Sequence, residues 1–129
     1  MSTKPQRFSP DQRLKTPAEF EAVFSRKSSA GDGTLVVYAA QNTLGHNRLG
    51  LVVARRKIGN AVQRNRWKRR LREAFRLQQE KFPRGFDLVV LPQSKTHPEF
   101  TQLQQALLDL AHRAARKWKR NHSPERPPR

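Results

Sequence analysis

Apolar residues recur along this chain with two different periods, and each period predicts one kind of element. Spacings of three and four residues are typical of amphipathic helices, whereas short β-branched and aromatic runs are typical of strands. The order helix, strand, strand, helix, strand, helix predicts a mixed sheet with packed helices, a single small α+β domain. The expected helices span residues 17–25, 61–80 and about 98–119, and the expected strands span residues 34–40, 48–54 and 86–91.

Local signals indicate where the first helix begins. Thr16 suits the N-cap, Pro17 the first helical position and Glu19 the third, so together they form a capping box. Phe20 and Phe24 then lie on one face of this helix, together with Val23. That spacing is also the spacing of an ordinary core face, so these rings have a structural as well as a functional interpretation.

The connections between elements complete the expected topology. The turn at residues 41–47 joins two strands, which we expect to pair as an antiparallel hairpin. Residues 28–33 are small and polar and predict a loop, and residues 55–59 predict a basic connection. On the first strand Tyr38 shares a face with Val36, and the alternation alone does not say which face meets the core.

Composition at the two ends predicts the domain boundaries. Residues 1–12 are polar with two prolines and predict a flexible arm, and residues 120–129 are basic and proline-rich and predict a disordered tail. The domain would occupy residues 13–119. The start of the chain lacks the apolar stretch of a secretory signal, and no apolar run approaches the about 20 residues of a membrane helix. We therefore expect a cytoplasmic protein without a membrane partner.

Charge is the property that points to a function. The 129 residues include 27 Lys and Arg against 10 Asp and Glu, a formal net charge of +17. Such an excess makes the folded chain repel itself unless a polyanion is bound, and the usual polyanion is nucleic acid. There are no cysteines, which excludes disulfides, thiolate metal sites and cysteine nucleophiles.

Over half of that charge lies in one segment, residues 55–76, which holds ten Lys or Arg and one Glu. Like charges one helical turn apart repel, so a solvated helix usually mixes signs. This helix is explained if the phosphates of a bound partner supply the missing negative charge, and arginine suits bidentate phosphate contacts.

The segment from Gly59 to Phe75 resembles the signature of the bacterial ribonuclease P protein family, chiefly in Arg64-Asn65-Arg66 followed by Lys68-Arg69 and Arg72-Glu73. The resemblance extends over roughly residues 8–119. It includes Arg13-Leu14-Lys15 near the start and the expected strand after the basic helix, which contains Asp87. Trp67 stands where the family pattern suggests an aliphatic residue, and we expect it to pack inward.

The resemblance implies a fold, two partners and two groups of site residues. The fold would include a β-α-β crossover of left hand, against the usual right-handed rule. The partners would be the catalytic RNA of ribonuclease P and precursor tRNA, with no small-molecule substrate and with Mg²⁺ held mainly by the RNA subunit. Residues implied to bind the RNA subunit are Arg64, Asn65, Arg66, Lys68, Arg69 and Arg72; those implied to bind the 5′ leader are Phe20, Phe24, Tyr38, Arg55 and Lys57.

Catalysis by the chain itself is not indicated. The ten acidic residues are scattered, and the four histidines lie in different expected elements without metal-ligand spacing. The resemblance implies that the RNA subunit performs the endonucleolytic cleavage that leaves a 5′-phosphate on mature tRNA. Two alternatives remain: a ribosomal or general RNA-binding protein, and a self-sufficient protein nuclease.

Overall fold

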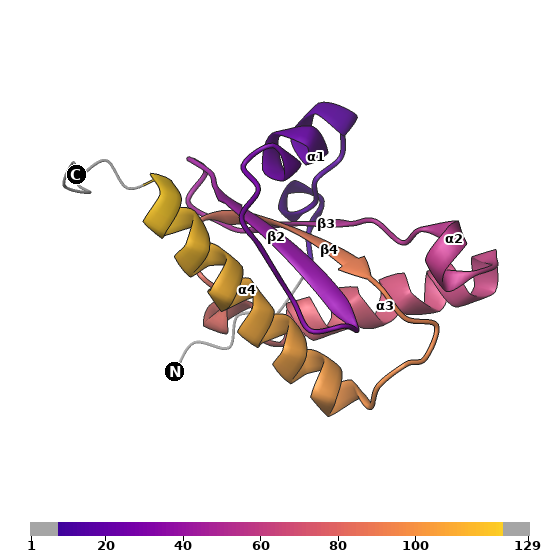
Figure 1. Cartoon of the computed structure of the whole chain (residues 1–129). Helices are drawn as coiled ribbons and strands as arrows, with labels where there is room; N and C mark the ends of the chain where they lie inside the picture. Colours follow the sequence, from indigo (N-terminus) through magenta and orange to yellow (C-terminus); the bar gives the residue numbers. More distant parts are fainter. Residues whose placement is uncertain (1–7, 123–129) are drawn as a thin grey trace.

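The computed structural model describes residues 8–122 and contains one four-stranded sheet with helices on both faces (Figure 1). α3 and α4 pack side by side against one face, and α1 lies on the other. The helices are α1 Pro17–Phe24, α2 Arg55–Ile58, α3 Ala61–Leu77 and α4 Phe100–His122, with 3₁₀ turns η1 Pro10–Gln12 and η2 Gln79–Lys81. The strands are β1 Ser29–Gly31, β2 Leu35–Gln41, β3 Arg48–Leu51 and β4 Phe86–Pro92.

The sheet order is β1-β2-β4-β3, so the predicted hairpin between β2 and β3 is wrong. β4 lies between these two strands, antiparallel to β2 and parallel to β3. The reason is the composition of β4, which is buried at every position except Leu91. A strand that is buried on both faces needs packed residues above and below the sheet. β4 has them at the centre of the sheet, where its side chains reach both core clusters.

The parallel pair β3 and β4 is joined by α2 and α3, which is the β-α-β crossover expected from the family resemblance. The hand of this crossover stays a prediction. The connection contains a short helix, α2, where only a basic loop was expected. Gly59 ends α2 at a φ of 111°, a conformation that favours glycine, and the Asn60 side chain then accepts a hydrogen bond from the Gln63 amide at 3.0 Å to cap α3.

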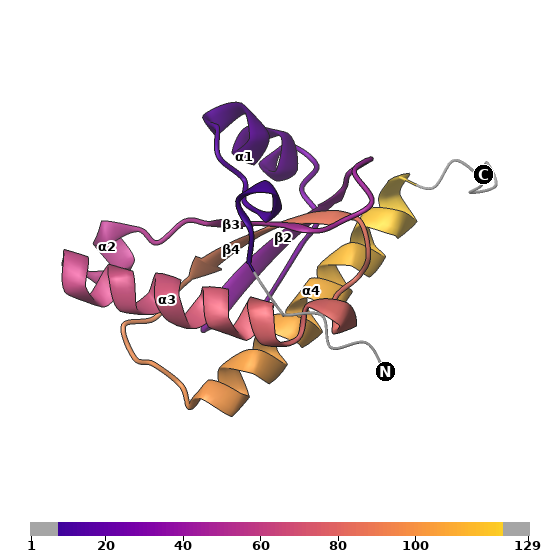
Figure 2. The ribbon, with the colours of Figure 1, turned by 180° about the vertical axis from the view of Figure 1, so that it is seen from behind.

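The main core lies between the sheet and the helices α3 and α4 (Figure 2). The strand face that meets it carries Leu35, Val37 and Ala39, all fully buried. Val36 and Tyr38 lie on the opposite face, where they are half-buried. Strand alternation alone did not say which face of β2 meets the core. The two long amphipathic helices pack on the face that carries Leu35, Val37 and Ala39, so this face is the buried one.

Further boundaries differ from those expected from the sequence, and the strand expected over residues 48–54 ends at Leu51. β1 lies within the expected loop, and its short Ser-Ala-Gly sequence carries little strand signal. The helix expected to reach residue 80 ends at Leu77 and is followed by η2. The expected arm and tail lie partly outside the described residues. Within them, residues 8–12 contain η1 and residues 120–122 continue α4, so neither of these parts is unstructured.

Candidate nucleic-acid interface

One side of α3 is fixed in the core, and this determines where its cations lie. Trp67, Leu71 and Phe75 are at most 1 % exposed, and they repeat every four residues along the helix. The Trp67 indole Nε1 also donates a hydrogen bond to the Ser94 carbonyl oxygen at 3.1 Å, as a buried indole requires. The expectation that Trp67 packs inward is confirmed, and the remaining faces of α3 are left for charge.

The residues expected to bind the RNA subunit lie on these outer faces. Arg64 is half-buried, and its Nε donates to the Gly59 carbonyl oxygen at 3.2 Å, so its stem follows the end of α2. The other five divide by exposure: Asn65, Arg66 and Arg69 are exposed, and Lys68 and Arg72 are half-buried. Half-buried basic side chains on a helix pack their aliphatic stems and keep the charged end in solvent.

A hollow of about 420 Å³ lies against this basic face and brings together four of the six residues. Its wall also includes Phe8 and Arg13, from the segment before α1. The Arg13 guanidinium lies 4.7 Å from the centre of the Phe8 ring, and that ring packs edge-on against Phe75. The hollow is lined by Phe8, Arg13, Asn65, Lys68, Arg69, Arg72, Glu73 and Arg76.

Sequence reasoning did not assign Phe8 and Arg13 to the site. Arg13 contributed only to the family resemblance, and Phe8 lay within the expected flexible arm. No periodic signal in the sequence places this short segment beside α3, because the contact is made across the fold. The hollow is therefore lined by two parts of the chain, the segment of Phe8 and Arg13 before α1 and the basic helix α3.

The electrostatics of this face are those of crowded cations. The pKa of Arg72 is lowered by burial and then by the nearby charge of Arg13, and burial followed by Arg66 lowers the pKa of Arg70. Glu73 is the one acidic residue of α3, and both of its oxygens bind Arg76, at 3.0 and 2.5 Å. The remaining positive charge is therefore available to an external anion.

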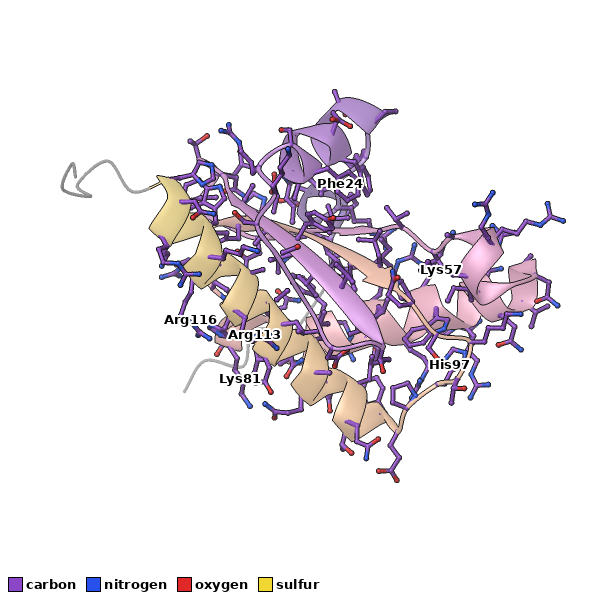
Figure 3. The ribbon with its side chains drawn as sticks, viewed as in Figure 1. Phe24, Lys57, Lys81, His97, Arg113 and Arg116 are labelled. Atoms are coloured by element: carbon purple, nitrogen blue, oxygen red, sulfur yellow. The ribbon has the colours of Figure 1, made fainter. Side chains whose placement is uncertain are left out.

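Arg70 differs from its neighbours because its interactions are structural. Its Nη2 donates to the Pro98 carbonyl oxygen at 2.6 Å, and its Nη1 lies 3.3 Å from Nδ1 of His97. The His97 ring stacks on Trp67 with centroids 4.6 Å apart, and burial, followed by Arg66 and Arg70, lowers the His97 pKa. These contacts tie the loop before α4 to α3 (Figure 3).

The second surface is the sheet face on the side of α1. The rings of Phe24 and Tyr38 pack edge-to-face with centroids 4.9 Å apart. Phe20 lies directly over Gly50, where a Cβ atom would approach its ring to 2.7 Å. All three rings are half-buried, so each packs against the smaller core and also keeps accessible surface.

An ion-pair network holds α1 on this face of the sheet. Arg48 of β3 binds Glu19 at 3.0 Å and the nearly buried Asp87 at 2.7 Å, and the Asn42 amide donates to Asp87 at 2.8 Å. Glu19 also accepts backbone N–H bonds from Lys15 and Thr16. Those two bonds, followed by Arg48, lower the pKa of Glu19. The network thereby fixes the positions of Phe20 and Phe24.

The two expected leader-binding cations lie apart from these rings. Arg55 and Lys57 are exposed on α2, and β3 runs from beneath α1 towards α2 in both ribbon views (Figures 1 and 2). Figure 3 shows Phe24 and Lys57 at separate positions along this upper side. The structure therefore places Phe24, at the end of α1, and Lys57, on α2, at different points along this side.

Two other kinds of site are not found among residues 8–122. No three His, Asp or Glu side chains in this part of the chain are grouped so that they could hold a metal ion. None of its helices combines the length and the apolar character needed to cross a bilayer.

A cationic helix on one face of the sheet and a partly exposed aromatic surface on the other, on a small α+β fold, are typical of a nucleic-acid-binding protein. The sequence profile described as Ribonuclease P matches residues 8–115. The chain therefore belongs to the bacterial ribonuclease P protein family, whose members are the protein subunits of the ribonuclease P holoenzyme, an endoribonuclease.

Curated relatives and solved structures agree with this assignment. The Ribonuclease P protein component of Pseudomonas entomophila is 45% identical over 87 residues, which span 67% of this chain and 65% of that protein. The same component of Thermotoga petrophila is 40% identical over 74% of this chain and 81% of its own length. The ribonuclease P protein of Thermotoga maritima superposes with a TM-score of 0.71 at 35% identity, covering 78% of this chain and 96% of that structure.

Proposed function

We propose that this chain binds the catalytic RNA of ribonuclease P with the exposed faces of α3 and binds the 5′ leader of precursor tRNA with the sheet face beside α1. The observation that carries the proposal is the pairing of two surfaces of different chemistry on one small domain. One surface is strongly cationic and suits folded RNA, and the other is aromatic and suits unpaired bases. Removal of the leader by the assembled enzyme would leave the 5′-phosphate end of mature tRNA.

The contact with the catalytic RNA is assigned to Arg64, Asn65, Arg66, Lys68, Arg69 and Arg72. Support comes from the one acidic residue of α3, Glu73, which is bound by Arg76. The ion pairs among residues 8–122 include none of the five Lys and Arg side chains in this group. The hollow along α3 adds Phe8 and Arg13, whose ring and guanidinium can stack on a base.

The leader contact is assigned to Phe20, Phe24 and Tyr38, with Arg55 and Lys57 further along the same side. A single-stranded leader exposes the faces of its bases, and each base stacked on an aromatic side chain contributes about 1–3 kcal/mol. Cations along the path would bind the phosphates between stacked bases. The Arg48 network contributes indirectly, because it holds α1 in place.

The chemistry of residues 8–122 does not favour a metal site on this chain. One candidate surface is cationic and the other is aromatic, and no three acidic or imidazole side chains in this range are grouped as metal ligands. We assign Mg²⁺ to the RNA subunit. The protein would reduce the phosphate repulsion between catalytic RNA and precursor tRNA, which favours their close approach and strengthens metal binding on the RNA indirectly. We place this assembly in the cytoplasm.

Changing Tyr38 to alanine is expected to weaken binding of precursor tRNA to the assembled enzyme by roughly 5- to 150-fold, which corresponds to the loss of one base stack of about 1–3 kcal/mol. Binding of mature tRNA, which lacks the leader, should change little. The measurement is a pair of equilibrium titrations of the reconstituted enzyme with the two tRNA forms.

Val36→Ala is the matched control for this experiment, because Val36 lies on the same face of β2 but has no ring to stack. A thermal melt of each variant tests whether the fold is retained, because Tyr38→Ala also removes the ring contact between Phe24 and Tyr38. Equal losses for precursor and mature tRNA in a folded Tyr38→Ala protein would reject the leader assignment.

A further inference from the structure

A second basic surface lies on α4, away from both surfaces described above. Its labelled members are Lys81, Arg113 and Arg116, which gather at the lower left of Figure 3, far from Phe24 and Lys57. All three side chains are exposed. The ion pairs found among residues 8–122 join Arg48 to Glu19 and Asp87, and Arg76 to Glu73, so these three cations take part in none of them.

The outward face of α4 changes character halfway along the helix. Its first half carries the neutral Gln102 and Gln105 and the acidic Asp109, which accepts a hydrogen bond from Gln105 at 2.9 Å. From residue 110 to residue 122 the helix contains no acid, and Arg113 and Arg116 lie on neighbouring turns of one face. The change is abrupt, whereas a solvated helix face usually mixes signs.

Helix electrostatics do not explain this arrangement. Cations are favoured near a helix C-terminus, but the effect is confined to the last turn. α4 ends at His122, so Arg113 and Arg116 both precede its last turn. Their mutual repulsion is therefore uncompensated by the helix dipole.

Tertiary contacts add a third cation to this repulsive pair. The His112 Nε2–H donates to the Lys81 carbonyl oxygen at 2.6 Å, and the Gln78 side chain donates to the Gln104 carbonyl oxygen at 2.8 Å. These two hydrogen bonds hold η2 and the preceding residue against α4. The backbone of Lys81 is thereby held next to His112, the chain neighbour of Arg113. Figure 3 draws the side chains of Lys81, Arg113 and Arg116 on the same side of α4. The three cations therefore share one surface.

We propose that Lys81, Arg113 and Arg116 form a second RNA-binding surface, which holds a stretch of RNA phosphate backbone without reading its sequence. Three cations without an exposed aromatic ring suit phosphates rather than bases. A membrane surface would require bulky apolar residues beside the cations, but the nearby Trp118 ring packs inward against Phe86. The inference rests on the proposed role in RNA binding and adds a contact on a different face.

The test is the double variant Arg113→Gln/Arg116→Gln in the full chain, with Lys27→Gln/Lys95→Gln as the control. The control removes two exposed cations that belong to none of the three surfaces, so the net charge is the same. Binding is titrated against salt with catalytic RNA alone, and with precursor tRNA added to the preformed protein–RNA complex. Phosphatidylserine vesicles serve as the probe for a membrane.

We expect the arginine variant to lose about tenfold in affinity and up to about two units of salt slope in one of the two RNA arms, with a smaller loss in the control. Loss with catalytic RNA alone assigns the phosphates to that RNA, and loss only with precursor tRNA assigns them to the tRNA. Unchanged binding in both RNA arms, or a loss confined to vesicles, would overturn the inference. A parent protein that binds neither RNA would instead reject the proposed function.

Discussion

Replacing Trp67 with alanine is expected to lower the free energy of unfolding by about 3–5 kcal/mol, the usual cost of deleting a large buried aromatic side chain. Trp67, a residue of α3, is fully buried in the main core, which lies between the sheet and the helices α3 and α4. The change would also leave the Ser94 carbonyl without its indole donor and the His97 ring without its stacking partner. Chemical denaturation of both proteins measures the difference.

Val62→Ala is the control for this prediction. Val62 lies on the same helix but is 73% exposed, so its truncation should change stability by no more than about 0.5 kcal/mol. Similar unfolding free energies for Trp67→Ala and the parent would contradict the packing of α3 described above. They would also remove the basis for assigning the outer faces of this helix to RNA.

The double change Arg64→Ala/Arg66→Ala is expected to weaken binding to the catalytic RNA by on the order of 100-fold or more. Hydrogen bonds to charged groups contribute about 1.5–3 kcal/mol each, and two would be lost. The slope of log affinity against log salt should fall by up to about one unit per contact. The measurement is a salt titration of binding.

Folding should be affected much less by this double change. Arg66 is exposed, and Arg64 makes one part-buried hydrogen bond to the end of α2. Loss of that bond costs about 0.5–1.5 kcal/mol, and the removal of two like charges from a crowded helix offsets part of it. A double variant that melts far below the parent would show that these arginines are structural. An unchanged salt slope would place the RNA contact on another face.

Local signals in the sequence predicted α1, α3 and α4, but not the short α2. The capping box at Thr16 and Glu19 forms as expected, with hydrogen bonds of 3.2 Å and 3.0 Å. Trp67 packs inward as expected, and Leu71 and Phe75 continue the buried side of α3 at four-residue spacing. Both signals act within one or two helical turns, so no knowledge of the remaining fold was needed.

The strand order was missed because it depends on distant parts of the chain. A turn between two strand-like segments favours a hairpin locally. In the structure, β4 begins 35 residues after the end of β3 and lies between β2 and β3 in the sheet. The apolar composition of β4 was the signal for a central position. β1 was missed for a different reason, since three small residues become a strand only by pairing with β2.

The candidate RNA-binding residues show the same difference between local signals and contacts made across the fold. The charge on α3 could be read from the sequence, because a run of cations on one helix stays together when the helix forms. Phe8 and Arg13 could not be placed beside it, because their contact depends on how the N-terminal segment crosses Phe75. Lys81 likewise could not be placed beside α4, because the hydrogen bond that His112 donates to its carbonyl oxygen joins residues 31 positions apart in the sequence.

Cleavage of precursor tRNA by reconstituted components tests the central claim most directly. The purified protein is incubated with precursor tRNA at low magnesium, with and without a ribonuclease P RNA, and the 5′ ends of the products are mapped. We expect no cleavage by the protein alone and faster cleavage by the RNA when the protein is added, as a protein subunit of ribonuclease P requires. Specific 5′ cleavage by the RNA-free protein, persisting after contaminating nucleases have been removed, would contradict it.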